Sequence, residues 1–355
     1  MSSQKALFLT EERGPFAVDT RDIQIPGVGE ILVEIKAAAL NPVDWKIQKT
    51  GSWVQNYPAV VGTDIAGDVA VLGEGVEGFS AGDRVSVSWD CFQFIGVLIV
   101  FQGFFTNDYA GFQQFTKVPA EIVAKIPESI SYSQAASVPL GLATAAIGLY
   151  WTSRGIGLNP NLDKNVQFSD QPAVVVGGAS SVGQYAIQML KFGGFSPIIT
   201  YASGHHTDYL KSLGATHIID RKSVAIQYLP TEVRKITTVS VKTVYDAISL
   251  PDTQEASYNT LAEGGNLVIV LNSQIKDPVE SKKVHHVFGN VQPEFNRSFG
   301  RTLYKQLTQF LQDGTVPNRV EELPNGLAGI PDGLKRLEND QVSGLKLIAL
   351  PHETA

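Results

Sequence analysis

Apolar residues follow two different patterns along the chain. Up to about residue 130, short apolar runs such as 31–40, 60–73 and 83–89 are separated by glycine and proline turn signals. From about Ser131 onward, continuous runs rich in Val and Ile alternate with helical stretches. These runs are residues 173–178, 197–200, 216–220, 243–248 and 266–272. Continuous apolar strands are typical of parallel sheets covered by helices, so the pattern predicts a β-rich half followed by an α/β half.

Two further elements are predicted after the α/β half. An amphipathic helix is expected over Phe299–Asp313, because Leu303 and Leu307 recur on one side and Gly314 follows as a stop. A strand is expected over residues 345–350. No proline- or serine-rich linker separates the halves, so the domain boundary is expected inside continuous packed structure.

Composition narrows the class of protein. The 355 residues are 43% hydrophobic and 18% charged, which is typical of one or two globular domains. The net charge of −7 and the absence of any basic run argue against nucleic acid as a partner. The one cysteine, Cys91, cannot form an internal disulfide or a Cys-x-x-Cys pair, and the first ten residues lack the long apolar segment of a secretory signal. A cytoplasmic protein is therefore expected.

One apolar segment raises the question of a membrane span. Residues 91–105 carry no charge, but they are short of the ~20 residues that a helix needs to span a bilayer. Their β-branched and aromatic residues favour a buried strand or an apolar loop, so we expect no membrane span.

The most informative local motif is a glycine-rich turn between a predicted strand and a predicted helix. It comprises Gly178, Ala179, Ser180, Ser181, Val182 and Gly183. The glycines permit a tight turn and a helix packed close to the strand, and the serines lie at the helix start, where a pyrophosphate binds. A strand, turn and helix without a ligand is the alternative. The second strand at 197–200 completes a βαβ unit and favours dinucleotide binding.

The end of that second strand indicates which nucleotide binds. NAD sites carry an acidic residue about 20 residues after the first glycine, and here the chain reads Tyr-Ala-Ser-Gly-His-His from residue 201. Hydrogen bonds or charge for a 2′-phosphate are available from the loop residues and two later cations. These are Ser203, Gly204, His205, His206, Lys211 and Arg221. NADPH is therefore predicted over NADH. An exposed loop without a role is the alternative for the histidine pair, and a solvated helix residue is the alternative for Lys211.

Several motifs in order resemble the medium-chain dehydrogenase/reductase superfamily. They are AALNPVDWK (38–46), PAVVGTDIAGDV (58–69), GVEGFSAGDRV (75–85), GLATAAIGL (141–149) and the glycine-rich turn. The chain looks most like the zinc-independent branch of quinone reductases and enoyl reductases, particularly fungal trans-acting enoyl reductases. The resemblance implies an α/β fold: a GroES-like catalytic domain of residues 1–130 and 296–355, and a Rossmann NADPH-binding domain of residues 131–295. It also implies an active site shared by the two.

The same resemblance bears on metal content. Zinc members of the superfamily hold their catalytic metal with a Cys in the first motif and Gly-His-Glu in the second. The matching places here are Asn41 and Gly62-Thr63-Asp64, which supply neither thiolate nor imidazole. We therefore expect no catalytic zinc. Alcohol oxidation benefits from a Lewis acid, whereas reduction of a double bond conjugated to a carbonyl suits a metal-free site.

The resemblance also assigns roles to residues. Lys46 is implied to steady enolate charge or relay a proton, and Asn41 and Thr144 to bond the nicotinamide or its ribose. The remaining cofactor contacts are implied for Val43, Asp44 and Trp45 in the first motif, for Leu271 and Asn272 through their backbone, and for Ser343 and Gly344. For Lys46 a plain surface lysine is the alternative, and for Thr144 helix packing.

Two departures from the family pattern stand out. Arg221 follows Asp220 where enoyl reductases usually have a tyrosine, and it could either bind phosphate or face solvent. Residues 90–106 replace a shorter glycine-rich link, and three explanations stay open: an apolar substrate pocket, a covered dimer edge, or a sequence artefact.

The function predicted from all of this is NADPH-dependent, metal-free reduction of an activated carbon–carbon double bond, enoyl or enone, or of a quinone. The substrate is expected to be a small apolar molecule, free or carrier-bound, and the protein a monomer or homodimer. Aldehyde or ketone reduction is one alternative. A non-catalytic NADPH-binding protein that serves a structural or partner-docking role is another.

Overall fold

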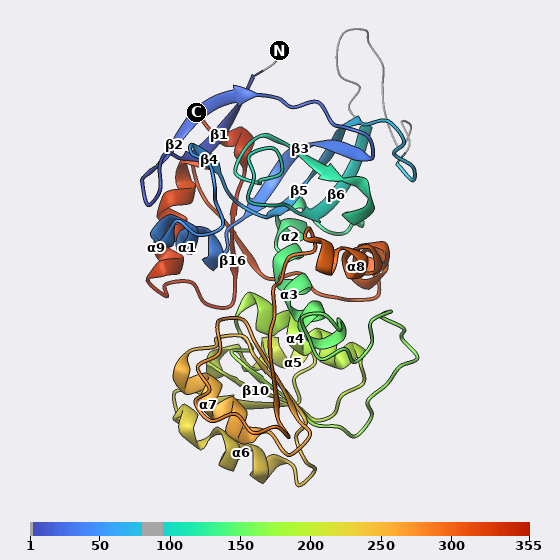
Figure 1. Ribbon diagram of the computed structural model, residues 1–355, viewed down its shortest axis with the longest axis vertical. Coiled ribbons are helices and arrows are strands. Elements are labelled where there is room, and N and C mark those ends of the chain that lie inside the picture. Colours follow the sequence, from blue (N-terminus) through green and yellow to red (C-terminus); the bar gives the residue numbers. More distant parts are fainter. Residues whose placement is uncertain (1–2, 80–94) are drawn as a thin grey trace. The chain divides into compact units, whose positions relative to one another are not determined.

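Parallel strands rich in Val and Ile form the middle of the chain in the computed structural model, which describes residues 3–79 and 95–355 (Figure 1). The six-stranded sheet has the order β11-β10-β9-β12-β13-β14, and every neighbouring pair is parallel. The strands are β9 (Ala173–Val176), β10 (Ile198–Ala202), β11 (His217–Asp220), β12 (Thr243–Asp246), β13 (Asn266–Ile269) and β14 (Lys283–His286). This is the expected Rossmann-type sheet.

Helices alternate with these strands and cover the sheet. They are α3 (Pro139–Tyr150), α4 (Ser181–Phe192), α5 (Thr207–Leu213), α6 (Leu229–Ile236) and α7 (Pro251–Thr260). Helix α4 packs on β9, β10 and β12, and its residues from Gly183 to Leu190 are all buried. Leu229 and Val233 of α6 join Val174, Ile199 and strand residues around them in one apolar cluster. Burial of this kind is the main stabilising contribution to such a layered fold.

The β-rich part of the chain forms a seven-stranded sheet of order β15-β16-β3-β5-β6-β8, with β7 also paired to β3. Its strands are β3 (Glu30–Ala39), β5 (Asp64–Leu72), β6 (Ile95–Gln102), β7 (Phe115–Pro119), β8 (Val123–Lys125), β15 (Val320–Glu322) and β16 (Lys346–Ala349). A second sheet, of order β2-β1-β4, consists of β1 (Ser3–Leu9), β2 (Phe16–Asp22) and β4 (Ala59–Val60). Strand β16 pairs antiparallel with β3, with Ile348 opposite Ala39. The GroES-like fold is thus built from segments that are distant in sequence.

Helices α1 (Pro42–Thr50), α2 (Tyr132–Ala136), α8 (Glu294–Gln312) and α9 (Ile330–Glu338) complete the fold. The predicted helix 299–313 corresponds to α8, which begins five residues earlier than expected and ends one residue earlier. The predicted strand 83–89 lies outside the described residues.

Among the residues that are described, no helix is both long and apolar enough to cross a membrane.

The apolar segment 91–105 is a sheet strand over the described part of its length. Strand β6 lies between β5 and β8, and Ile99, Val100 and Phe101 are fully buried. Pairing on both edges explains why the segment is so rich in β-branched and aromatic residues. The prediction of a strand is therefore confirmed for residues 95–102 and its burial for residues 99–102, and residues 90–94 lie outside the described part.

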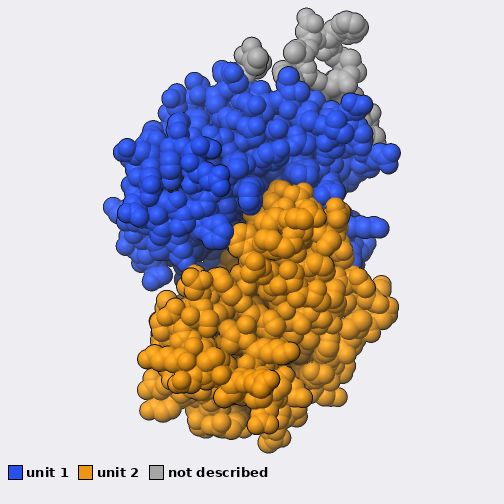
Figure 2. All heavy atoms as spheres, viewed as in Figure 1, with its two compact units in different colours: residues 1–140, 303–355 blue, residues 141–302 orange. Residues whose placement is uncertain are grey.

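The chain divides into two units, one of Met1–Leu140 with Leu303–Ala355 and the other of Gly141–Thr302 (Figure 2). The sequence predicted breaks at 130/131 and 295/296. Helix α2 belongs with the first unit because it packs against β3 and β5. Helix α8 is continuous across the second division, so no local sequence change marks that boundary.

Candidate active site

The glycine-rich turn connects β9 to α4 and is closely packed against its neighbours. Gly177 has φ +77°, in the left-handed region that favours glycine. A Cβ on Gly183 would lie 2.2 Å from the carbonyl oxygen of Gly177, and a Cβ on Gly178 would lie 2.0 Å from Thr200 Oγ1 of β10. The two predicted glycines are thus required by close packing of turn, helix and neighbouring strand.

Ser180 is the N-cap of α4. Its side chain accepts a hydrogen bond from the backbone N–H of Gly183 at 3.1 Å. Ala179 lies in the turn, and Ser181 and Val182 open the helix, so the predicted pyrophosphate-binding residues Ala179–Val182 are contiguous at a helix N-terminus between the two glycines. A cap, a twelve-residue helix and glycines without room for side chains fit a dinucleotide phosphate.

Most of the predicted 2′-phosphate residues lie where β10 and β11 end, and Lys211 lies further along, in α5. Ser203 is buried, and its Oγ accepts a hydrogen bond from Arg221 Nε at 2.7 Å. His205 is exposed and His206 is buried, with ring centroids 3.8 Å apart. Lys211 is exposed on α5. Arg221 therefore reaches back to the β10 end although it follows a different strand.

Asp220 places a carboxylate at this edge, a position that was not expected from the sequence. Asp220 ends β11 opposite Ala202, and its Oδ1 accepts a hydrogen bond from the backbone N–H of Gly204 at 2.9 Å. Hydrogen bonds from the backbone of Lys222 and of Gly204 lower the pKa of Asp220. The expectation that no carboxylate lies near the end of β10 therefore needs correction, because the adjacent parallel strand supplies an ionised one. The strand pattern contained this information, since parallel neighbours end at the same edge.

The remaining predicted residues of the Gly141–Thr302 unit lie on α3 and after β13. Thr144 is buried, and its carbonyl oxygen accepts a hydrogen bond from Tyr245 Oη at 2.8 Å. A Cβ on Gly289 would lie 1.9 Å from Thr144 Oγ1, so the backbone of this loop packs directly on the threonine. Leu271 and exposed Asn272 follow β13, and the Asn272 carbonyl accepts a hydrogen bond from Gln254 Nε2 at 3.1 Å. Their contacts with a cofactor stay predictions.

A buried polar cluster lies in the other unit, and we call Asn41, Asp64 and Lys346 the Lys346 cluster. Lys346 Nζ lies 2.6 Å from Asn41 Oδ1 and 2.8 Å from Asp64 Oδ2. Asn41 Nδ2 also donates to Asp64 Oδ2 at 3.0 Å. The three residues are 1%, 0% and 4% exposed, respectively. Lys346 was not predicted as a site residue, although a lysine that opens an apolar strand was a visible signal.

Asn41 thus has other partners than the predicted ones. Both ends of its side-chain amide are engaged within the Lys346 cluster. It is also the N-cap residue of α1, and its backbone N–H donates to Asp44 Oδ2 at 2.8 Å. Its contact with nicotinamide stays a prediction. Its internal contacts link the N-cap of α1 to Asp64 and Lys346.

Asp44 faces the protein interior. It is 0% exposed, and burial raises the pKa of its carboxyl to about 7, with the Asn41 N–H acting in the opposite direction and Asp64 adding to the rise. Val43 and Trp45, its neighbours in the first turns of α1, are partly exposed.

Lys46 is half-buried on α1. Desolvation lowers the pKa of its ammonium, and Nζ lies 5.6 Å from the centroid of the Trp45 ring. Among residues 3–79 and 95–355, no carboxylate lies within ion-pair distance of Lys46. A partly buried lysine without a counter-ion is poised to meet negative charge from elsewhere.

Ser343 and Gly344 lie three and two residues before Lys346, respectively. Gly344 has φ +68°, and its carbonyl oxygen accepts a hydrogen bond from Arg319 Nε at 3.1 Å. The turn leads the chain into β16. Its predicted cofactor contact stays a prediction.

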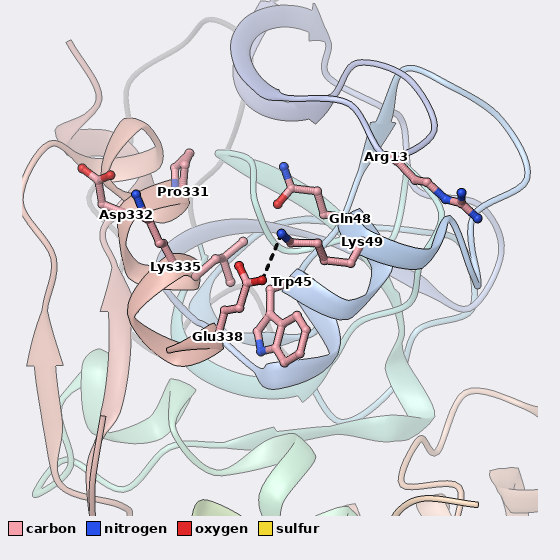
Figure 3. Close-up of a pocket in the computed structure, with 9 residues that line it drawn as sticks. Arg13, Trp45, Gln48, Lys49, Pro331, Asp332, Lys335 and Glu338 are labelled. Carbon is pink, nitrogen blue, oxygen red and sulfur yellow. Dashed lines mark ion pairs between the residues drawn. The ribbon is translucent and has the colours of Figure 1, made fainter. Parts of the chain in front are cut away.

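A surface pocket of about 420 Å³ lies between α1 and α9 (Figure 3). An ion pair of 2.9 Å between Lys49 Nζ and Glu338 Oε1 crosses it. Its lining residues are Arg13, Trp45, Gln48, Lys49, Pro331, Asp332, Leu334, Lys335 and Glu338. Of the predicted site residues it contains Trp45 alone, and its charges of both signs do not select a ligand class.

The groups at the positions matched to metal ligands do not fit a zinc ion. Asn41 and Thr63 are weak ligands, and the ammonium of Lys346 already bonds Asn41 and Asp64 and would repel a dication. In the described part of the chain, no three His, Cys, Asp or Glu side chains come together in a group that could hold a metal.

Comparisons with known proteins agree with this architecture. The alcohol dehydrogenase GroES-like domain matches residues 27–128, and the zinc-binding dehydrogenase family matches residues 181–312. A trans-enoyl reductase from Aspergillus japonicus is 31% identical over 90% of this chain and 89% of that protein. A zinc-type alcohol dehydrogenase-like protein from Schizosaccharomyces pombe is 29% identical over 97% of this chain and 99% of that protein.

Solved structures share the fold along the whole chain. An alcohol dehydrogenase superfamily protein from Novosphingobium aromaticivorans has a TM-score of 0.76 at 23% identity, covering 97% of this chain and 99% of the other. A mycobacterial quinone oxidoreductase has a TM-score of 0.72 at 23% identity, covering 98% of this chain and 100% of the other. At such identities the likeness concerns the fold.

Proposed function

Because the chain belongs to the medium-chain dehydrogenase/reductase superfamily and is an oxidoreductase of that superfamily, we propose that it reduces an activated carbon–carbon double bond with NADPH and without a metal. The substrate class is an enoyl compound, an enone or a quinone. The names of its sequence relatives, which include trans-enoyl reductases, favour the enoyl and enone substrates. The single observation that carries the proposal is Lys46, half-buried, with a lowered pKa and no carboxylate partner among the described residues.

The residues of the Gly141–Thr302 unit hold the cofactor in this proposal. The turn from Gly178 to Gly183 binds the pyrophosphate at the start of α4, and Thr144, Leu271 and Asn272 hold the nicotinamide end. NADPH, when bound, supplies a hydride for the β-carbon of the substrate.

Lys46 acts on the negative charge that the reduction creates. Hydride addition to the β-carbon moves the π electrons toward the carbonyl oxygen, where an ammonium stabilises the enolate. A proton on the α-carbon then completes the saturated product, and Lys46 or solvent supplies it. A desolvated ammonium without a carboxylate partner is stronger in both tasks than one already paired, because its field is not cancelled.

Preference for NADPH rests on Arg221 and Ser203. The guanidinium that bonds Ser203 Oγ is placed to take a 2′-phosphate as well, since it has further N–H donors. The carboxylate of Asp220 opposes this preference, but backbone N–H groups engage it. Arg221 thus offsets the repulsion that Asp220 would exert on a phosphate.

The test measures NADPH oxidation with 2-enones, enoyl thioesters, quinones and aldehydes, followed by product analysis. A saturated ketone or acyl thioester, or a hydroquinone, supports the proposal, whereas an allylic alcohol identifies a carbonyl reductase. NADPH that raises the melting temperature without turnover of any substrate indicates a cofactor-binding protein without catalytic duty, because ligand binding stabilises the folded state by mass action.

A further inference from the structure

The Lys346 cluster contains a buried cation that the proposed reaction does not use directly. Lys346 opens β16, where its backbone N–H donates to the Arg319 carbonyl at 2.7 Å, and its side chain is 4% exposed. A buried ammonium is unfavourable unless its charge is paired and its N–H groups are bonded. Asp64 supplies the charge and Asn41 a second acceptor, 2.8 Å and 2.6 Å from Nζ.

The partners of this ammonium come from elements that are far apart in the sequence. Asn41 follows β3 and caps α1, whereas Asp64 opens β5. The second carboxylate oxygen of Asp64 accepts a hydrogen bond from the Leu140 backbone N–H at 2.7 Å, within the first turn of α3. One cation therefore joins β16, the start of β5 and the N-cap of α1, and Asp64 extends the link to α3.

The bond from Lys346 also decides how the Asn41 amide is oriented. An amide presents an acceptor and a donor end that are nearly equal in shape. Because an ammonium can only donate, Lys346 fixes Oδ1 toward itself, and Nδ2 then points to Asp64 at 3.0 Å. The N-cap of α1 is thus held in one orientation.

We propose that Lys346 is a positioning residue. Its buried ammonium links Asn41 and Asp64, as a metal ion would do. Through Asn41 it fixes the position of the first turns of α1 and therefore of Lys46. The proposal rests on the proposed function, in which Lys46 meets the enolate. Its basis is geometric: Lys46 follows the N-cap by five residues on a helix of nine residues, so a displaced cap displaces Lys46. Asn41 and Asp64 also occupy the positions matched to metal ligands in zinc relatives. The ammonium of Lys346 is therefore a cation that links two of these positions without a metal.

Four full-length proteins test the proposal: the wild type, Lys346→Met, the double variant Asp64→Asn/Lys346→Met, and Lys117→Met as a control. Lys117 is an ion-paired lysine of the same unit, 3.3 Å from Glu30, and lies on β7 rather than against α1. The double variant removes both charges and so leaves no unpaired buried carboxylate. Each protein is also labelled with 5-fluorotryptophan, and the fluorine resonance of Trp45 is assigned with Trp45→Phe among the four tryptophans.

We expect Lys346→Met to lower kcat by about tenfold to a hundredfold with an unchanged KM for NADPH, because misplacement of a catalytic group affects the transition state. The Trp45 resonance shifts in the same variant. The double variant regains melting temperature but neither kcat nor the resonance position, because Asn41 still lacks its ammonium donor. Lys117→Met changes neither kcat nor the resonance.

A double variant with the kcat and Trp45 resonance of the wild type would overturn the proposal, since the ion pair would then only add stability. Wild-type kcat in Lys346→Met would overturn it as well. Should Lys346→Met fail to fold, the double variant alone decides. Failure of the proposed function has a different signature: the wild type turns over no substrate, and the Trp45 resonances of the folded variants still decide the role of Lys346.

Discussion

Burial shifts the ionisation of two neighbouring side chains on α1 in ways that bear on activity and stability. Lys46 and Asp44 lie two residues apart, and desolvation dominates the pKa shift of each. For the ammonium, desolvation lowers the pKa, and for the carboxyl it raises the pKa, because in both cases the neutral form is favoured. The two shifts lead to separate tests.

Replacement of Lys46 should change both the rate and its pH dependence. Since the pKa of Lys46 lies below its usual 10.5, we expect kcat of the wild type to fall as pH rises through that lowered value, where the ammonium is lost. Lys46→Met should reduce kcat by about a hundredfold and abolish this alkaline limb. Lys46→Arg, which keeps its charge, should move the limb to higher pH. A pH profile of Lys46→Met that matches the wild type would exclude a role for this charge.

Replacement of Asp44 should change the pH dependence of stability. The folded-state pKa of about 7 exceeds the ordinary 3.8, so between these values the folded protein binds more protons than the unfolded chain. Asp44 therefore makes the free energy of unfolding decrease as pH rises from about 4 to about 7. Asp44→Asn removes this decrease, so its stability relative to the wild type should be greater at pH 8 than at pH 5.

Denaturant unfolding at the two pH values measures this difference. The exposed Asp277 provides a matched Asp→Asn control at the protein surface. A constant difference between Asp44→Asn and the wild type at both pH values would contradict the raised pKa.

The elements of the cofactor-binding unit impose steric and electrostatic requirements on their ends. At the start of α4, the requirement is space for the backbone of the turn. At the ends of β10 and β11, the requirement is a balance of charge between Arg221 and Asp220. Parallel pairing brings these strand ends to one edge of the sheet. Each of these element ends gives a prediction.

Gly183→Ala should weaken NADPH binding and destabilise the protein by about 1–3 kcal/mol, the usual effect of overpacking. The added Cβ would lie 2.2 Å from the Gly177 carbonyl oxygen, so α4 must move away from the turn. Gly264→Ala is the control, because its Cβ meets no atom within 4 Å although its φ of +72° adds strain. Calorimetric titration with NADPH measures the effect, and equal affinity in both variants would contradict it.

Arg221→Met should raise the Kd for NADPH by about tenfold to a hundredfold, as expected for loss of a charged hydrogen bond of about 1.5–3 kcal/mol. The Kd for NADH should not change, since NADH lacks the 2′-phosphate. Arg234→Met provides the control, because Arg234 is exposed on α6 and its guanidinium donates a hydrogen bond to Thr231 of the same helix. Equal weakening of NADPH and NADH would refute a phosphate contact.

At the scale of the whole molecule, the chain combines a family match to zinc-binding dehydrogenases with a cluster that does not fit zinc. We expect elemental analysis of the purified protein to find no stoichiometric zinc, and chelator treatment to leave activity and melting temperature unchanged. A zinc-loaded protein that loses stability on chelation would contradict the assignment of Lys346 as the cation of this site.

The sequence predicted those features whose causes are local. Continuous apolar runs identified the parallel strands, and the glycines around Ser180 identified the turn, because periodicity and backbone freedom act over a few residues. The Lys346 cluster was not predictable in this way. Its hydrogen bonds join residues 305 and 282 positions apart, and nothing near Lys346 indicates that its partners are Asn41 and Asp64. The contact of Asp220 with the β10 end was missed for a related reason, since its partner Gly204 follows the neighbouring strand.

The position of β16 in its sheet determines the order in which the two units of the protein can fold during synthesis. Residues 141–302 form a contiguous unit that a growing polypeptide completes while still attached to the ribosome, whereas β3 and β15 acquire the strand between them only after residues 346–349 have emerged. Until then Asp64 has no ammonium to neutralise it and an internal sheet edge stays unpaired, a state that invites chaperone binding and aggregation. Nascent chains arrested before residue 346 should therefore carry a finished nucleotide-binding half and an unfinished catalytic one.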